Sequence, residues 1–356
     1  SVTAGAGGAH VVAPPSGPLR LGVPVPTRGP GSGEGDEVLR AVRAVVDKAN
    51  AAGGVDGRKV DVVAVPTDDD AARTDALQRV DTLVGGFAID APAGLPWVMP
   101  ADTGPTGPDV TAGELAAEQS GAALGLDLAG RSNDTRLVGA IVAPGPDAGL
   151  ATGLARTVAV QQVEASTDTS CDQEIIALRK RNVVALALAG PPDLARRCAA
   201  AAAREGWRPP GGLLLAPSAV YAHLERDLVA QGARSAVALP APSTDDPGPN
   251  RFRQAAPGCD TYRSLMSFAA AELALDAARA NNGVVSLAAV RDHHWHSDLY
   301  DVDGGRQTTS HVVTIRFGRW VNAGPPRTSR PPMRRGVLNP GGRIIAYAVR
   351  EAAPPR

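Results

Sequence analysis

Residues 19–70 carry the pattern of a strand, a glycine-rich loop, a helix and a second strand, and this stretch constrains the fold more than any other. Apolar residues alternate over residues 19–25, as in a half-buried strand. After the loop, apolar residues recur at helical spacing over residues 38–49. Glycines then end the helix, and residues 59–65 supply the second strand. The chain therefore opens with a βαβ unit, which predicts a parallel sheet.

The alternation of strands and helices continues along most of the chain. A polar break at residues 133–135 divides it into two runs, and further strands are expected near residues 137–142, 183–189 and 213–216. A length of 356 residues is sufficient for two packed cores. We therefore predict an α/β fold with two lobes, in which ligands bind at the carboxyl ends of the strands.

Composition argues against several classes of function. The chain has 36 Lys and Arg against 37 Asp and Glu, and no block of basic residues, which argues against binding to nucleic acid or to an anionic membrane surface. No apolar run reaches the roughly 18 residues that a membrane span needs. Aromatic residues make up only 3% of the chain, so a ligand pocket has few rings to use.

Motifs for cofactors, metals and catalysis are incomplete. The glycine-rich loop at residues 29–35 departs from the dinucleotide fingerprint because Asp36 stands where a glycine is needed, and no P-loop motif occurs. The cluster of His293, His294 and His296 has no converging cysteine or acid at useful spacing, so we interpret it as a solvated helix end. No G-x-S-x-G elbow is present. We expect no cofactor, no metal and no enzymatic activity.

Three cysteines leave two alternatives open. An odd count fits one disulfide with a single thiol left over as well as three buried thiols. Cys171 opens one predicted helix and Cys198 lies in the next, so the helices flanking residues 183–189 bring a Cys171–Cys198 disulfide within reach. Cys259 has no assigned role.

Several segments together resemble a known family. LRLGVPVPTRGP followed by DKANAAGGVDGRKVDVVAV is similar to the start of type I periplasmic binding proteins, especially the branched-chain amino-acid group of solute receptors. LPWVMPADTGP, RLVGAIVAPGPDAG, VVALALAGPPDLARRCAAAAAREGW and RFGRWV resemble later strands, loops and helices of that family. The likeness spans residues 19–321. It implies a two-lobed flytrap fold, with three crossovers between mostly parallel sheets flanked by helices.

The resemblance also implies a division of the chain. Residues 1–18 are expected to be a flexible lead-in, residues 19–133 the first part of lobe I, and residues 134–245 lobe II. Residues 246–305 then return to lobe I, and residues 306–322 close lobe II. Residues 323–356 are a Pro- and Arg-rich tail in which residues 343–349 are a candidate strand.

The family's ligand site transfers only in part. Ala101 and Thr103 align with positions that hold the ligand carboxylate, and Asp102 lies between them. The family's serine-bearing loop falls near residues 85–88, where no serine occurs, and Arg234 stands near the position of the acid that balances a bound ammonium. A zwitterionic ligand would thereby lose a charge-assisted partner worth about 1.5 to 3 kcal/mol. The full set of candidate ligand-binding residues is Phe87, Ala101, Asp102, Thr103, Asp147, Ser218, Tyr221 and Arg234.

The resemblance implies an extracytoplasmic solute-binding protein that closes on a small organic ligand and delivers it to an ABC transporter. The ligand is expected to differ from a standard branched-chain amino acid. The partners would be the small molecule and a transporter permease or membrane sensor. The protein would be tethered to the cell surface through a signal peptide or lipid anchor outside these residues. The alternative is a ligand-sensing or interaction module with the same fold and a decayed amino-acid site.

Overall fold

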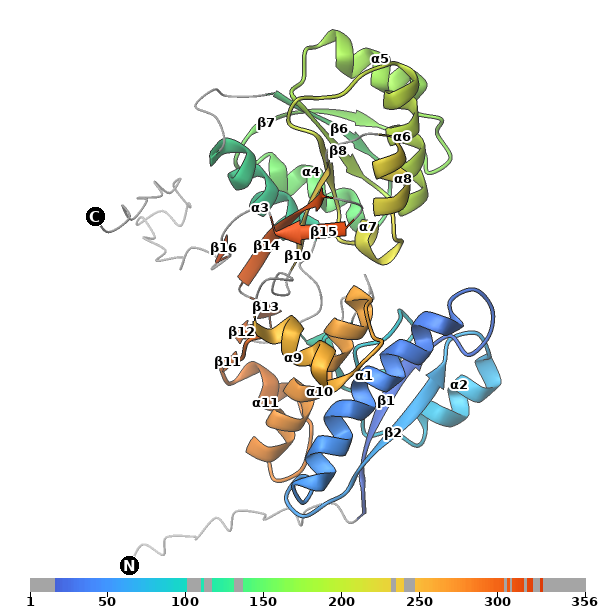
Figure 1. Ribbon diagram of the computed structural model, residues 1–356, viewed down its shortest axis with the longest axis vertical. Coiled ribbons are helices and arrows are strands. Elements are labelled where there is room, and N and C mark those ends of the chain that lie inside the picture. Colours follow the sequence, from blue (N-terminus) through green and yellow to red (C-terminus); the bar gives the residue numbers. More distant parts are fainter. Residues whose placement is uncertain are drawn as a thin grey trace, which may run out of the picture.

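The computed structural model describes residues 17–100, 110–111, 117–130, 137–231, 235–239, 247–303, 306–307, 309–316, 319–322 and 327–328. Two α/β lobes are stacked along the long axis of the molecule (Figure 1). Lobe I contains the first strands and the helices of residues 247–291, and lobe II contains the middle of the chain (Figure 1). The predicted fold class, parallel-dominated sheets flanked by helices, is confirmed.

The helices are α1 (Ser32–Ala51), α2 (Asp70–Leu77), α3 (Ala117–Gly130), the 3-10 helix η1 (Pro146–Ala148), α4 (Gly149–Leu154), α5 (Asp172–Lys180), α6 (Pro192–Arg204), α7 (Ser218–Tyr221), α8 (Glu225–Ala230), α9 (Pro247–Ala255), α10 (Tyr262–Ala280) and α11 (Leu287–Arg291). The strands are β1 (Leu19–Val25), β2 (Val60–Pro66), β3 (Thr82–Val84), β4 (Trp97–Val98), β5 (Val110–Thr111), β6 (Leu137–Val142), β7 (Ala159–Glu164), β8 (Ala185–Ala189), β9 (Leu213–Leu215), β10 (Ser235–Leu239), β11 (Trp295–His296), β12 (Asp301–Asp303), β13 (Arg306–Gln307), β14 (Thr309–Arg316), β15 (Arg319–Asn322) and β16 (Arg327–Thr328).

The sheet of lobe I has five parallel strands in the order β2-β1-β3-β4-β5. Helices α1 and α10 pack on one face, and α2 covers the other around Leu83 and Trp97. Helix α10 is buried almost all round, so its apolar residues are not confined to one stripe. Thr261 caps it by accepting a hydrogen bond from the amide of Ser264 at 3.2 Å.

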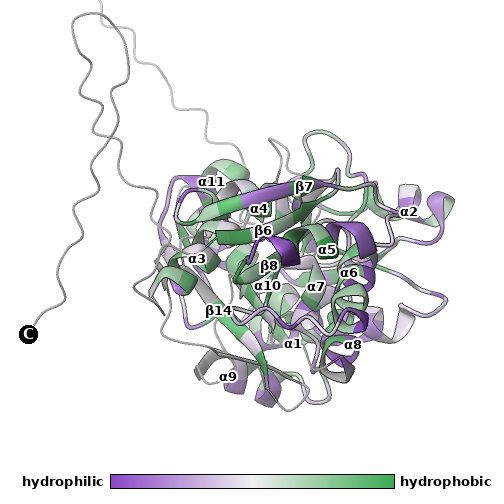
Figure 2. Cartoon of the chain, turned by 90° about the horizontal axis from the view of Figure 1, so that it is seen from above, coloured by the Kyte–Doolittle hydropathy of each residue, from purple (hydrophilic) through white to green (hydrophobic). Residues whose placement is uncertain are grey.

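The sheet of lobe II has eight strands, ordered β15-β14-β10-β9-β8-β6-β7 with β16 beside β14. Strands β6 to β10 are parallel, whereas β14 pairs antiparallel with β10, β15 and β16. One face packs against α5, α6, α7 and α8, and the other against α3 and α4. Apolar residues of the strands and helices pack between these layers. In Figure 2 strands such as β6 and β8 are coloured hydrophobic, whereas parts of α6 and α8 are coloured hydrophilic.

Helix α3 corrects the predicted boundary at residue 133. It packs on α4, β10 and β14 of lobe II rather than on lobe I. Gly121 and Gly125 permit this, because a Cβ at Gly121 would lie 2.1 Å from the carbonyl oxygen of Leu150, and one at Gly125 would lie 1.9 Å from Oγ1 of Thr157. The glycines four residues apart are the sequence signal of this close helix packing. The rest of the predicted division stays a prediction.

A small antiparallel sheet, β11-β12-β13, lies beside lobe I. Strand β13 begins the segment that we expected to close lobe II, but it pairs with β12 instead. Strands β14 and β15 of that segment do extend the lobe II sheet. The candidate strand at residues 343–349 lies outside the described residues. Within the described ranges, no helix is both long and apolar enough to cross a membrane.

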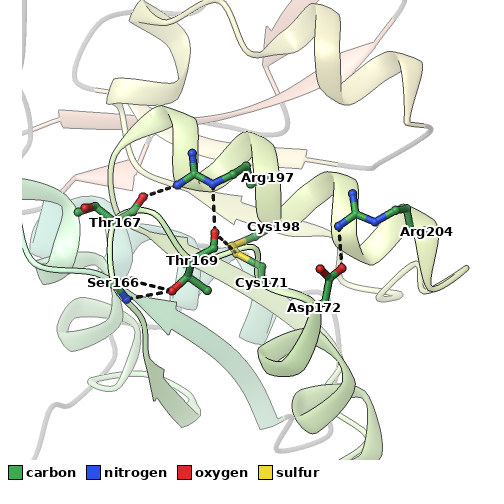
Figure 3. The surroundings of a disulfide bond; sticks show 8 residues. All are labelled: Ser166, Thr167, Thr169, Cys171, Asp172, Arg197, Cys198 and Arg204. Atoms are coloured by element: carbon green, nitrogen blue, oxygen red, sulfur yellow. Dashed lines mark hydrogen bonds and ion pairs between the residues drawn. A yellow bond between two sulfur atoms is a disulfide. The ribbon is translucent and has the colours of Figure 1, made fainter.

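A disulfide joins Cys171, just before α5, to Cys198 in α6 (Figure 3). Their Cα atoms are 4.9 Å apart, and 27 residues separate them in the chain. Closing a loop of that length stabilises the folded chain by about 3.5 kcal/mol in the chain-entropy model. Polar contacts flank it, since Arg197 Nε donates to the carbonyl oxygen of Thr169 at 3.0 Å. Cys259 is a buried free thiol.

Candidate functional site

Five side chains from both lobes meet beyond the carboxyl ends of their strands. Glu34 stands in the first turn of α1 and Phe87 follows β3, both in lobe I. Tyr221 ends α7 and His223 lies between α7 and α8, both in lobe II. Arg263, in the first turn of α10, contacts residues of both lobes. We call these five residues the interlobe cluster; α7 lies at the edge of lobe II that faces lobe I (Figure 1).

Arg263 is the centre of the interlobe cluster. Its guanidinium lies 3.9 Å from the ring centroid of Phe87 and 5.0 Å from that of Tyr221. Its Nη1 is 2.5 Å from Oε2 of Glu34, and only 6% of the side chain is exposed. The attraction between a cation shielded from water and an aromatic face is worth about 2 kcal/mol. Arg263 thus contributes charge and stacking surface between the lobes.

Two glycines hold Phe87 in place. Gly85 and Gly86 have φ values of 50° and 79°, in the left-handed region that favours glycine. A Cβ at Gly86 would lie 2.4 Å from the carbonyl oxygen of Pro24. The amide of Phe87 donates to that same carbonyl at 2.9 Å. The loop therefore binds β1 directly, so Phe87 is presented from a rigid support.

The lobe II side contributes two rings. Tyr221 packs on Tyr262 of α10, with ring centroids 5.4 Å apart. His223 adopts φ 52°, and its ring nitrogens lie 3.9 Å from Oε1 of Glu34 and 3.5 Å from Oε1 of Glu225. The hydrogen bond with Glu225 and the nearby Glu34 carboxylate raise the pKa of His223 above its ordinary value of 6.5. His223 thus faces acidic groups from both lobes.

Glu34 is a carboxyl group whose pKa is raised by its surroundings. Burial raises its pKa above the ordinary value of 4.5, and the positive charges of Arg263 and His223 oppose that rise. Burial is the largest of these effects. A titratable acid therefore lies next to the guanidinium on which the two rings stack.

A second polar pair lies at the strand ends of lobe II. The hydroxyl of Ser218, which opens α7, donates to Oδ2 of Asp147 at 2.6 Å. Asp147 is 5% exposed and Ser218 7% exposed. Asp147 follows β6 and Ser218 follows β9, and only β8 lies between these two strands in the sheet, so their carboxyl ends bring the two residues together. A carboxylate held in this way can accept hydrogen bonds from a ligand or balance a cation.

The structure describes four of the eight candidate ligand-binding residues. Arg263 brings Phe87 and Tyr221 together, and a hydrogen bond joins Asp147 to Ser218. Ala101, Asp102, Thr103 and Arg234 lie outside the described residues. A ligand-binding role for any of the eight stays a prediction.

Sequence reasoning did not identify Arg263, Glu34 or His223. Arg263 left one signal, because a basic residue in the first turn of a helix opposes the helix dipole and is unusual there. Glu34 lies in the glycine-rich stretch at residues 29–35, and the structure places it in the first turn of α1. Their pairing joins positions far apart in the chain, so it follows from the topology rather than from a local motif.

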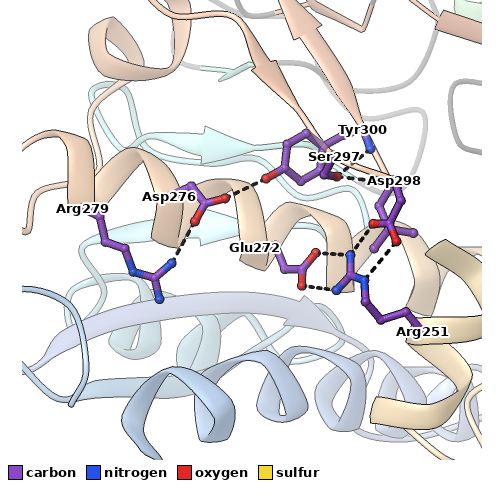
Figure 4. Close-up of polar contacts among 8 residues, drawn as sticks. Arg251, Glu272, Asp276, Arg279, Ser297, Asp298 and Tyr300 are labelled. Atoms are coloured by element: carbon purple, nitrogen blue, oxygen red, sulfur yellow. Dashed lines mark hydrogen bonds and ion pairs between the residues drawn. The ribbon is translucent and has the colours of Figure 1, made fainter. Parts of the chain in front are cut away.

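A second arginine cluster lies entirely within lobe I (Figure 4). Arg251 of α9 donates through Nη2 to Oε2 of Glu272 at 2.9 Å and to Oδ1 of Asp298 at 2.6 Å. Its guanidinium lies 5.6 Å from the ring centroid of Phe268. The hydrogen bond from Arg251 lowers the pKa of Asp298 below its ordinary value. We call this set the Arg251 cluster; it fastens α9 and the segment before β12 to α10.

Two members of the histidine cluster converge on one acid, Asp301, which corrects the expectation that no acid would do so. His294 Nε2 is 2.6 Å and His296 Nδ1 3.7 Å from Oδ1 of Asp301. The predicted helix end is partly a strand, since residues 295–296 form β11. Over the part of the chain that the structure describes, no group of three or more His, Cys, Asp or Glu side chains is arranged to hold a metal ion.

A cavity of about 270 Å³ lies elsewhere, at the opposite edge of the lobe II sheet. Trp207, Pro209 and Pro210 line it together with the start of β9 and the end of α6. These residues precede β9, so the cavity lies at the amino ends of the parallel strands. Because ligands of such sheets bind at the carboxyl ends, the interlobe cluster is the stronger candidate site.

Comparisons with known proteins give the fold a family context. Residues 18–97 match the model of a periplasmic binding protein family. No curated protein matches the sequence. A fatty acid ABC transporter substrate-binding protein from Thermomonospora curvata superposes with a TM-score of 0.65 at 15% identity, over 88% of this chain and 93% of that one.

Two further solved structures are similar. A solute-binding protein of an ABC transporter from Rhodopseudomonas palustris HaA2, in complex with p-hydroxybenzoic acid, has a TM-score of 0.67 at 16% identity, over 88% of this chain and 98% of that one. A leucine-binding protein from Thermotoga maritima has a TM-score of 0.66 at 14% identity, over 86% and 98%. These neighbours are ABC-transporter and solute-binding proteins with varied ligands. The expected resemblance is confirmed: the chain has the fold of the type I periplasmic binding proteins, whose family model its first strands and helices match.

Proposed function

We propose that the protein is an extracytoplasmic solute receptor that closes on a small organic ligand and delivers it to an ABC transporter. The observation that carries this proposal is the meeting of side chains from both lobes beyond the carboxyl ends of their strands. A ligand that contacts both lobes binds the closed form better than the open one, so closure can report its presence to a partner. No covalent chemistry is required.

The Cys171–Cys198 disulfide supports an extracytoplasmic location, because disulfides persist in oxidising compartments. Tethering to the cell surface and delivery to a permease belong to the same proposal.

A ligand-sensing module that signals to a membrane partner is the second candidate. It is favoured by the direct contact between Arg263 and Tyr221, which joins the lobes through protein side chains alone.

We further propose that the ligand differs from leucine, isoleucine and valine. The two acids of the described site already have protein partners, Glu34 with Arg263 and Asp147 with Ser218. An ammonium group would have to compete with those partners. The titles of similar structures name fatty acid, p-hydroxybenzoic acid and leucine, and these three classes define the compounds to be tested.

Thermal unfolding and calorimetric titration with branched-chain amino acids, hydroxybenzoates and fatty acids test the proposal. A ligand at one hundred times its Kd stabilises the folded protein by about 2.7 kcal/mol. We expect stabilisation by a compound that is not a branched-chain amino acid, and its reduction in Ser218→Ala. The matched control is Ser166→Ala, an exposed serine of lobe II that bonds Asp168. Stabilisation by no compound, or by branched-chain amino acids alone, would contradict the proposal.

Transport and sensing are separated by a second measurement. Uptake of the identified ligand into vesicles that contain a candidate permease should depend on the receptor if the protein serves transport. Ligand-dependent binding to a membrane sensor without any uptake would favour the sensing module instead.

A further inference from the structure

The interlobe cluster joins the lobes through protein side chains. Arg263 of lobe I lies over the ring of Tyr221 in lobe II, and Tyr262 packs on the same ring. His223 of lobe II lies 3.9 Å from Glu34 of lobe I. Each of these contacts exists only while the lobes are together. They therefore stabilise the closed form and contribute nothing to an open one.

The lobe I half of the cluster is prepared in advance. Arg263, Glu34 and Phe87 contact one another within lobe I, and Gly85 and Gly86 fix the loop that presents Phe87. Opening the lobes would leave this arrangement intact and remove only the contacts with Tyr221 and His223. The surface that lobe II meets is thus preorganised, which lowers the entropy lost on closing.

The backbone of His223 is in an unusual conformation. A φ of 52° is uncommon for residues other than glycine, although histidine tolerates it better than most. Such conformations persist where surrounding contacts hold them and are frequent at functional sites. Here the left-handed turn between α7 and α8 places the imidazole between Glu34 and Glu225.

We propose that the interlobe cluster is a pH-sensitive latch that holds the two lobes together before ligand arrives and thereby regulates access to the binding site. This regulation rests on the proposed solute-binding function. Ligand enters only when the latch opens, so the open fraction scales the apparent affinity.

The charges around His223 set the direction of the pH dependence. The charged groups facing it are Glu34 with Glu37 behind it on α1, Glu225 on α8 and Arg263 on α10. Attraction between the lobes requires a protonated His223 and an ionised Glu34. Glu34 ionises above its ordinary 4.5, and His223 loses its proton above its ordinary 6.5. The attraction is therefore lost as the pH falls through the raised pKa of Glu34 and as it rises through the raised pKa of His223.

The test measures the distance between the lobes in ligand-free full-length protein. Spin labels at Lys48→Cys in α1 and Lys180→Cys in α5 occupy exposed positions, one on each lobe. Pulsed dipolar spectroscopy across a pH series then gives the ratio of closed to open molecules. Variants are Tyr221→Leu, which leaves the Arg263–Glu34 pair intact, and His223→Asn, which retains a residue tolerant of the left-handed turn. The matched control is Arg251→Gln, whose cluster lies within lobe I.

We expect a closed population in the unsubstituted protein that decreases as the pH rises through the raised pKa of His223. Tyr221→Leu should lower the ratio of closed to open molecules at least about tenfold, because it removes a desolvated cation–π contact. His223→Asn should lower it about two- to threefold and flatten its dependence on pH above 6.5, since the histidine is nearly half exposed. Arg251→Gln should leave the ratio unchanged.

The latch is refuted if ligand-free protein is open at every pH, or if Tyr221→Leu and Arg251→Gln change the ratio equally. Failure of the proposed function gives a different result. In that case no compound binds, while the ratio of closed to open molecules still responds to pH and to Tyr221→Leu. Conversely, tight ligand binding by a protein that is open without ligand retains the receptor function and removes the latch.

Discussion

The Arg251 cluster and the interlobe cluster use the same chemistry in two settings. In each, an arginine pairs with a carboxylate and lies over an aromatic ring. The Arg251 cluster joins α9, α10 and the segment before β12 within lobe I, and 34% of the Arg251 side chain is exposed. Arg263 is buried and contacts both lobes. The first cluster therefore contributes to folding stability, whereas the second contributes to the balance between open and closed forms.

The largest expected effect comes from the support of Phe87. Gly86→Ala places a Cβ 2.4 Å from the carbonyl oxygen of Pro24 and forces alanine to φ 79°. We expect a loss of about 3 kcal/mol in the free energy of unfolding, because the neighbour is backbone and cannot rotate away. Chemical denaturation measures this loss.

Gly94→Ala is the matched control for that substitution. Gly94 has φ 84°, but a Cβ there would meet no atom within 4 Å. Its replacement tests conformational strain without a clash and should lose about 1 kcal/mol. Equal losses for the two variants would show that the loop carrying Phe87 is not tightly packed. The lobe I half of the interlobe cluster would then not be preorganised, and the two clusters would differ less.

The second effect in size is that of Arg251→Gln. The substitution leaves the Glu272 and Asp298 carboxylates, which are 18% and 32% exposed, without their guanidinium partner. We expect a loss of about 2 kcal/mol in the free energy of unfolding. Arg79→Gln is the control, since its helical ion pair with Asp75 is exposed and worth less than about 0.5 kcal/mol. A similar loss in both variants would mean that the Arg251 cluster is only a surface ion pair.

Features formed by residues that are close together in the sequence could be predicted from it, whereas features that join distant residues could not. The opening strand, loop and helix are encoded locally, so the βαβ unit and the fold class were predictable from alternation and helical spacing. Helix α3 was placed in the wrong lobe because the same apolar residues suit either sheet. The close contacts of Gly121 with Leu150 and of Gly125 with Thr157 hold the helix on lobe II, and these contacts join elements that are separate in the sequence.

The candidate site was predictable only in part for the same reason. Phe87, Asp147, Ser218 and Tyr221 were candidates from the family resemblance, and the structure places each of them after a strand. Arg263 pairs with Glu34 although the two residues are far apart in the sequence, and no local pattern connects their positions. The charged pair of the interlobe cluster was therefore the feature least predictable from the sequence.

The smallest expected effect is a difference of sign in the pH dependence of stability. The hydrogen bond from Arg251 lowers the pKa of Asp298 below 3.8. That carboxylate therefore contributes stability above its ordinary pKa, and the contribution is lost as the pH falls through the lowered value. The free energy of unfolding of the unsubstituted protein, relative to Arg251→Gln, should thus decrease in acid. We expect a change below about 1 kcal/mol, because Asp298 is partly exposed.

Glu34 should show the opposite sign. Burial raises its pKa above 4.5, so its contribution is present below the ordinary value and is lost as the pH rises through the raised one. The unsubstituted protein should therefore lose stability relative to Glu34→Gln as the pH rises. Over the same pH range it should gain or hold stability relative to Arg251→Gln. Denaturation of the three proteins from pH 3 to 7 measures both differences. Parallel curves would mean that Glu34 is solvated like an ordinary surface acid. The interlobe cluster would then lack a buried acid beside Arg263, and it would differ less from the Arg251 cluster.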